Sequence, residues 1–329
     1  MTVEYSLNHE LKPGLNPFYL PTKTVVAGHQ IDNPILFGTV NLPKGWDTSN
    51  RRSVSLLLWG LWQTHTRQSS GFAQYLEQFL VDHGTAVVTF DALGLSDPEI
   101  GGKSNGDQTN YHVHQIMSDA VTVLKTLAQH PQLTNTDSQP IRYHLAGISL
   151  GGLVTLRMLT SSQELSQLEV DSVIAVSPLA NLSTAWDHYF EAGSKDPKHN
   201  RILKLDPNNP QDKGMIERGF LFKYVGGNRI IIPVTKDVLY DSQEGEMDRL
   251  QKVSFDRTSR VCVIGSNADG LSAMDVVSRR IGPLRPDDQV FKYLEGDHNL
   301  ELPDGSNLWE QTAILARDFI NPNLRIRYK

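Results

Sequence analysis

The sequence is poor in cysteine, since its 329 residues include only Cys262. A single cysteine excludes an internal disulfide framework, because each bridge needs a pair of thiols. Cys262 lies within the apolar run RVCVIG, a setting typical of a small buried strand residue and not of a reactive thiol.

Basic blocks, long apolar runs and a leader-like start are also missing. The formal net charge is -6 and no Lys- and Arg-rich block stands out, which disfavours nucleic acid as a partner. No apolar run approaches the length needed to cross a bilayer, so we expect no integral membrane segment. The start, MTVEYSLNHELKPG, lacks a basic region followed by an apolar core, and we expect a cytoplasmic protein.

What the sequence does have is an alternation of short apolar runs with amphipathic stretches. Strands are predicted at 36–43, 53–60, 85–91, 141–147, 170–178, 260–265 and 289–294. Helices are predicted between them, at about 72–83, 113–129, 149–159, 272–282 and 307–320. Strands that alternate with helices predict βαβ units, and hence an α/β fold with a mostly parallel central sheet flanked by helices.

The alternation stops after Pro178 and resumes near residue 257. Between them, residues 181–256 are polar and rich in proline and glycine, with only short apolar pieces such as GFLFKYV and RIIIPV. We predict an insertion above a continuous sheet, so that the core comprises 35–180 and 257–329. Residues 1–34 show no clear periodicity and are predicted to form an N-terminal arm.

One serine stands between two glycines at the junction of a predicted strand and helix. Residues 147–151 read Gly-Ile-Ser-Leu-Gly and match the G-x-S-x-G pattern. A tight turn there exposes the side chain of Ser149, and the glycines leave room where a Cβ would collide. The N–H of Leu150, at the helix start, can point at a developing oxyanion. An ordinary glycine-containing turn is the alternative.

A nucleophilic serine needs a base, and the base needs an acid to orient it. His298 follows the strand at 289–294, in LEGDHNL, and Asp269 follows the strand at 260–265, in IGSNADG. Active sites of open α/β sheets gather at the carboxyl ends of the strands. The chain order Ser149, Asp269, His298 therefore predicts a catalytic triad, with Asp275 as the second choice of acid.

These three segments resemble the nucleophile, acid and histidine loops of the α/β-hydrolase family, over about residues 35–320. Within it the chain is most similar to the esterase, monoacylglycerol lipase and serine aminopeptidase-like branch, which includes feruloyl esterases. The resemblance implies that 181–256 is a lid. It also implies a second oxyanion donor after a His-Gly pair, where this chain has Trp59-Gly60. That donor would be the N–H of Leu61, with Trp62 as the alternative.

These residues together predict a serine hydrolase for a small acyl compound, most simply a carboxylic ester, working without cofactor or metal. His112 and His114 have H-x-H spacing, but they precede a helix and lack further ligands in sequence, so we expect no metal site. Two alternatives stay open: an acyltransferase with the same triad, and a non-catalytic binding protein that uses the cavity under the lid. The sequence leaves the oligomeric state and the physiological substrate open.

Overall fold

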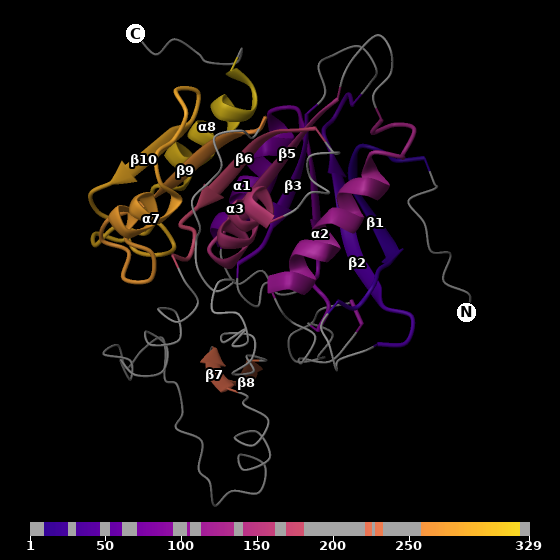
Figure 1. The fold of residues 1–329 in the computed structure, drawn as a ribbon, viewed down its shortest axis with the longest axis horizontal. Coiled ribbons are helices and arrows are strands. Elements are labelled where there is room, and N and C mark those ends of the chain that lie inside the picture. The colour runs from indigo at the N-terminus through magenta and orange to yellow at the C-terminus, as the bar shows by residue number, and fades with distance from the viewer. Residues whose placement is uncertain are drawn as a thin grey trace, which may run out of the picture.

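The protein is built around one eight-stranded sheet (Figure 1). The computed structural model describes residues 10–25, 31–46, 53–60, 71–94, 104–105, 113–134, 141–161, 169–180, 221–225, 228–232 and 258–322. In spatial order the strands of this sheet are β1 (Gly14–Pro21), β2 (Ile35–Leu42), β4 (Thr85–Phe90), β3 (Ser53–Leu58), β5 (Arg142–Ile148), β6 (Val170–Val176), β9 (Arg260–Ser266) and β10 (Gln289–Tyr293). From β4 to β10 every neighbouring pair is parallel.

Helices cover both faces of the sheet. They are α1 (Gly71–Asp82), α2 (Val113–Leu127), α3 (Leu150–Ser161), α7 (Met274–Ile281) and α8 (Trp309–Ile320). Successive strand residues point to opposite faces. In β5, Leu145 packs in the cluster that contains side chains of α2, α3 and α7, whereas Ala146 packs in the cluster of α1 and α8. This arrangement confirms the mostly parallel sheet flanked by helices that the alternation predicts.

The segment assigned to an N-terminal arm contributes a strand that the sequence analysis missed. β1 lies antiparallel to β2 at the edge of the sheet. Its inward side chains alternate as Asn16, Phe18 and Leu20, but the polar first member hides the period. The buried side chain of Asn16 is stabilised by hydrogen bonds instead of apolar contacts, because its amide donates to the carbonyls of Lys12, Gly14 and Val40. Proline at 17 and 21 is tolerated because edge strands need fewer N–H donors.

Within the predicted insertion, two strands form a separate antiparallel pair. β7 (Leu221–Val225) pairs with β8 (Asn228–Ile232), in a two-stranded sheet distinct from the main one. The other residues of 181–256 lie outside the described part of the chain. No described helix combines the length and the apolar character that crossing a membrane would require.

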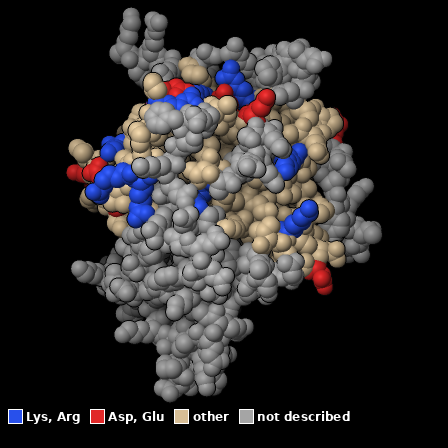
Figure 2. Space-filling model, in the orientation of Figure 1, with Lys and Arg blue, Asp and Glu red and all other residues tan. Residues whose placement is uncertain are grey.

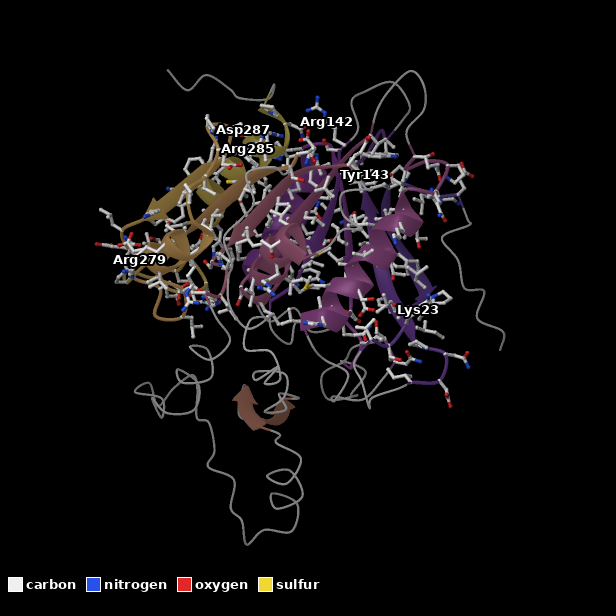
Figure 3. All side chains as sticks on the ribbon, viewed as in Figure 1. Lys23, Arg142, Tyr143, Arg279, Arg285 and Asp287 are labelled. Carbon is white, nitrogen blue, oxygen red and sulfur yellow. The ribbon has the colours of Figure 1, made fainter. Side chains whose placement is uncertain are left out.

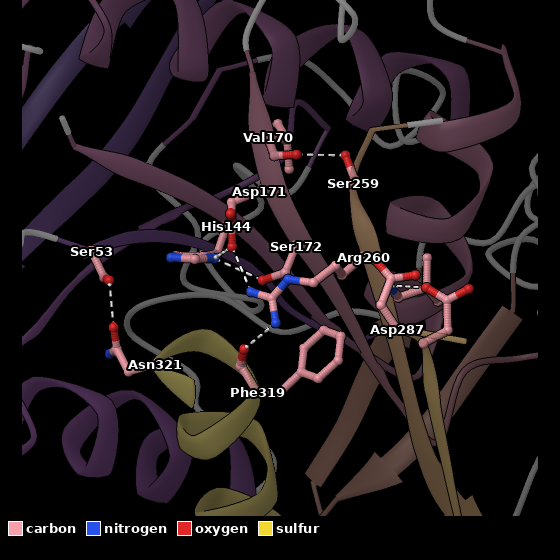
Figure 4. A network of polar contacts seen from close by, with 12 residues as sticks. Ser53, His144, Val170, Asp171, Ser172, Ser259, Arg260, Asp287, Phe319 and Asn321 are labelled. Carbon is pink, nitrogen blue, oxygen red and sulfur yellow. Dashed lines mark hydrogen bonds and ion pairs between the residues drawn. The ribbon is translucent and has the colours of Figure 1, made fainter. Parts of the chain in front are cut away.

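A polar network ties the end of α8 to the amino ends of three central strands (Figure 4). Arg260 of β9 donates to the Asp171 carboxylate over 2.6 Å and to the Phe319 carbonyl over 3.0 Å. Nδ1 of His144 lies 2.7 Å from Oγ of Ser172 in the next strand. Burial lowers the pKa of His144 to about 3, although the nearby Asp171 carboxylate opposes that shift. The imidazole is therefore neutral at physiological pH.

Ion pairs and polar turns fix the strand at the other edge of the sheet. Asp288 accepts the N–H groups of Val261 and Arg285, each over 2.7 Å, which seats the start of β10 beside β9. Arg285 pairs with Asp287 in the same turn (Figure 3). On the face drawn in Figure 2, Lys and Arg side chains of the described residues lie among Asp and Glu side chains.

Candidate active site

Ser149 occupies a strained turn between β5 and α3. Its φ angle is 56°, in the left-handed region that residues other than glycine rarely adopt. Three backbone hydrogen bonds hold it there: its N–H donates to Val176 (2.9 Å), and its carbonyl accepts from Leu153 (3.1 Å) and Leu179 (3.2 Å). Since such a conformation costs about 1–3 kcal/mol, it persists because the surrounding contacts impose it.

The two glycines of the motif are required by close backbone packing. A Cβ on Gly147 would lie 2.1 Å from the carbonyl oxygen of Gly151, and one on Gly151 would lie 2.2 Å from that of Leu58. Neither oxygen can rotate away, because both belong to the main chain. The glycines thus let the first turn of α3 approach the ends of β5 and β3 closely enough to form the sharp turn at Ser149.

Asp269 is buried in the loop after β9, with about 1% of its surface exposed. One carboxylate oxygen, Oδ1, accepts the N–H groups of Leu271 (2.8 Å) and Ser272 (3.1 Å). The other, Oδ2, lies 2.8 Å from Nδ1 of His298. Hydrogen bonds to both oxygens compensate for the hydration that burial removes from the carboxyl group.

His298 joins the acid to the serine. It lies in the loop after β10, and its Nε2 is 2.7 Å from Oγ of Ser149. Its side chain retains 18% of its accessible surface, whereas that of Asp269 is fully covered. Residues from the carboxyl ends of β5, β9 and β10 therefore form one continuous chain of hydrogen bonds. The structure brings together the three side chains that the sequence analysis selected.

The other selected residues lie elsewhere or outside the described part of the chain. Asp275, the second choice of acid, is exposed on α7, where Lys292 donates to it over 2.9 Å and lowers the pKa of its carboxyl group. Leu150 is buried as the first residue of α3, where N–H groups lack an intrahelical acceptor. Leu61 and its alternative Trp62 are not among the described residues.

A second buried carboxyl group was not selected from the sequence. Asp119 of α2 accepts from Gln115 (2.9 Å) and Thr22 (3.0 Å), and it lies against the loop after β4 through the N–H of Leu93 (3.5 Å). Burial raises the pKa of Asp119 to about 7, against the lowering effect of these bonds. The sequence could have indicated this buried group, because Asp119 is an acidic residue on the apolar face of a predicted helix, between Ile116 and Val123.

The described residues include no group of three or more His, Cys, Asp or Glu side chains placed to hold a metal ion. His114, one half of the H-x-H pair, lies on α2, and His112 falls outside the described residues.

Comparison with known proteins identifies the class. The family model described as "Alpha/beta hydrolase family" matches residues 56–310, more than half of the chain. The protein therefore belongs to the α/β-hydrolase family, and this membership supports hydrolase activity. A search of curated proteins gave no match.

Solved structures share the fold at low sequence identity. A protein from Agrobacterium vitis S4 is 18% identical with a TM-score of 0.61, over 93% of this chain and 99% of that one. A soluble variant of monoglyceride lipase from Saccharomyces cerevisiae, in complex with a substrate analogue, is 14% identical with a TM-score of 0.56, over 92% and 98%. Est1E from Butyrivibrio proteoclasticus, with ferulic acid bound, is 15% identical with a TM-score of 0.54, over 88% and 95%.

Proposed function

We propose that the protein is a serine hydrolase that cleaves a small acyl compound, most simply a carboxylic ester, through an acyl-enzyme on Ser149. The observation that carries this proposal is the chain of hydrogen bonds from Asp269 through His298 to Ser149, with separations of 2.8 and 2.7 Å. Both distances suit proton transfer without rearrangement of the side chains.

In this mechanism Oγ of Ser149 attacks the substrate carbonyl while its proton passes to Nε2 of His298. Asp269 accepts the Nδ1–H bond, which selects the tautomer with a free Nε2 lone pair and stabilises the imidazolium that forms. The imidazolium then protonates the leaving alcohol. Water, activated by the same nitrogen, cleaves the acyl-enzyme and regenerates the serine hydroxyl.

The oxyanion of the tetrahedral intermediate needs donors beside Ser149. We assign this role to the N–H of Leu150, supported by its place at the start of α3, and to the N–H of Leu61, supported by the family resemblance. Removing one such donor from a hydrolase typically lowers the rate by about 100-fold or more.

Residues 181–256 are proposed to form a lid that selects the substrate. They are inserted directly after the loop that follows β6, at the same edge of the sheet as Ser149, whose carbonyl accepts the N–H of Leu179. Est1E from Butyrivibrio proteoclasticus and the yeast monoglyceride lipase bind ferulic acid and a substrate analogue in their own structures. These ligands support an ester as the first substrate class to test.

The proposal is tested by labelling with a fluorophosphonate, followed by peptide mass spectrometry. We expect the label on Ser149, no label in Ser149→Ala, and strongly reduced labelling in His298→Ala. Ser177→Ala is a matched control: this serine directly follows β6 in a positive-φ conformation, and its buried hydroxyl has no hydrogen-bond partner among the described residues. It should label normally.

A panel of p-nitrophenyl esters of increasing acyl length then measures turnover. Faster product formation with an added alcohol than with water alone would favour the acyltransferase alternative. A folded protein with an unmodified Ser149 would contradict the proposal and favour the non-catalytic binding protein.

A further inference from the structure

The loop that carries His298 is closed on itself around that residue. The carbonyl of Asp297 accepts the N–H of Leu300 over 3.0 Å, and the N–H of Asp297 donates to Glu301 over 2.9 Å. Leu300 has a φ angle of 63°, which turns the chain back toward its start. His298 and Asn299 thus form the middle of a tight turn whose two ends meet at Asp297.

The carboxylate of Asp297 adds a second closure from the side chain. Its Oδ1 accepts the N–H of Asn299 over 2.8 Å and that of Glu301 over 2.9 Å. Both donors follow His298 in the chain and the acceptor precedes it. One carboxylate oxygen therefore links the residues on either side of the histidine. Short aspartate side chains commonly stabilise turns in this manner.

We propose that Asp297 is a positioning residue, whose carboxylate sets the backbone of His298 so that the imidazole reaches both Asp269 and Ser149. The proposal rests on the function proposed above. The partners of the ring belong to two other loops, after β9 and β5, so the His298 backbone must lie correctly relative to both. The ring is partly exposed, with 18% of its side-chain surface accessible, and both of its nitrogens lie within hydrogen-bond distance of these partners.

The far end of the same loop is held independently by α8. The indole N–H of Trp309 donates to the Asn299 carbonyl over 2.8 Å, and the N–H of Leu308 donates to Leu300 over 2.9 Å. At the near end, the Asp297 carboxylate adds to the two backbone hydrogen bonds of the same residue. Because reacting groups that are displaced by about 1 Å can lose about 100-fold in rate, loosening of this end is enough to affect catalysis.

The role proposed for Asp297 is to set the geometry of the loop around His298, not to place a negative charge beside the imidazole. The residue is exposed to solvent, where water and salt screen the effect of its charge on the imidazole. Asparagine separates the two contributions, because its amide oxygen can accept both N–H bonds and carries no charge. Alanine removes the bonds and the charge together.

The test compares Asp297→Ala, Asp297→Asn and the control Asp304→Ala on a p-nitrophenyl ester. Asp304 stabilises the next turn of the chain, accepting the N–H and hydroxyl of Ser306 over 2.9 and 2.6 Å, but does not flank the histidine. We expect Asp297→Ala to lower kcat by about 10- to 100-fold with little change in KM. Asp297→Asn should stay within about 3-fold of the natural protein, and Asp304→Ala should match it.

A second readout does not depend on turnover. The Nδ1 proton shared by His298 and Asp269 should give a far-downfield proton NMR signal, assigned by its loss in His298→Ala. It should persist in Asp297→Asn and Asp304→Ala, and weaken or vanish in Asp297→Ala, while thermal melting shows each variant to be folded. This signal tests positioning even if no ester is cleaved, so a failure of the proposed function is recognised separately.

Two results would overturn the positioning role. One is an Asp297→Ala protein with normal kcat and an unchanged downfield signal. The other is an equal loss in Asp297→Asn and Asp297→Ala, which would assign the effect to charge.

Discussion

At the scale of single residues, the site depends on backbone conformations that few side chains permit. Ser149 lies in the left-handed region, and its neighbours Gly147 and Gly151 meet main-chain oxygens where a Cβ would be. The pattern G-x-S-x-G therefore describes a packing requirement as much as a chemical one.

Replacing Gly151 by alanine should destabilise the protein and reduce labelling of Ser149. The new Cβ would lie 2.2 Å from a fixed carbonyl oxygen, so the start of α3 must move, at a cost of at least about 1–3 kcal/mol. Chemical denaturation measures the loss. Gly265→Ala is the control: its Cβ would meet the flexible thioether of Met274 at 2.7 Å and should cost less. Equal losses in the two variants would contradict this account.

Asp119 makes stability depend on pH. Its folded pKa of about 7 exceeds the ordinary value of 3.8, so between these values the folded state binds a proton that the unfolded state lacks. Its contribution to stability is therefore complete below about pH 4 and is lost as pH rises through 7. Each pKa unit corresponds to about 1.4 kcal/mol. As pH rises from 4 to 8, the stability of Asp119→Asn relative to the natural protein should therefore increase, by up to a few kcal/mol.

Urea denaturation at several pH values measures this difference between the two proteins. The comparison cancels the contribution of His144, whose lowered pKa acts in the opposite direction between about pH 3 and 6.5. A constant difference across the range would show that Asp119 does not titrate as described.

At the scale of elements, α8 is attached at both ends, and the two attachments serve different purposes. At its start, Trp309 bonds to the histidine loop, and its ring covers Gly71 at the beginning of α1, where a Cβ would lie 2.5 Å away. At its end, Arg260 bonds the last turn to β9. The first attachment helps to hold the histidine loop, whereas the second helps to hold α8 against the sheet.

Arg260→Lys should lower stability without affecting the chemistry of Ser149. The guanidinium joins Asp171 and the Phe319 carbonyl at once and lies 4.8 Å from the centre of the Phe319 ring. An ammonium group cannot reproduce that planar, forked arrangement, so we expect a loss of about 1–2 kcal/mol. Thermal melting and fluorophosphonate labelling measure the two properties. Slower labelling at a temperature where the variant is folded would show that the two ends of α8 are coupled.

At the scale of the whole molecule, the sheet order assembles the site. β5 and β9 are separated by β6, and β10 follows β9 at the edge, so the three loops meet although up to 149 residues separate Ser149 from His298 in the chain. Parallel pairing puts the carboxyl ends of these strands at one edge of the sheet. The site therefore requires the long-range pairing to be complete.

Much of this organisation was predictable from local patterns. Short apolar runs located the strands around Ser149, Asp269 and His298, and a period of 3.6 in apolar residues located the helices. The G-x-S-x-G motif, the positions after strands and the order along the chain together selected the three side chains. These features depend on neighbours close in sequence, so the sequence by itself determined them.

The tertiary structure decided what depends on distant partners. It paired β1 with β2 although the first inward residue, Asn16, is polar, because hydrogen bonds replaced apolar burial there. It buried Asp119 between three segments, which changed its pKa. It also brought the imidazole of His298 to Asp269 and Ser149, which lie 29 and 149 residues away in the chain. Burial of a polar group depends on which remote donors reach it, and only the folded chain brings those donors together.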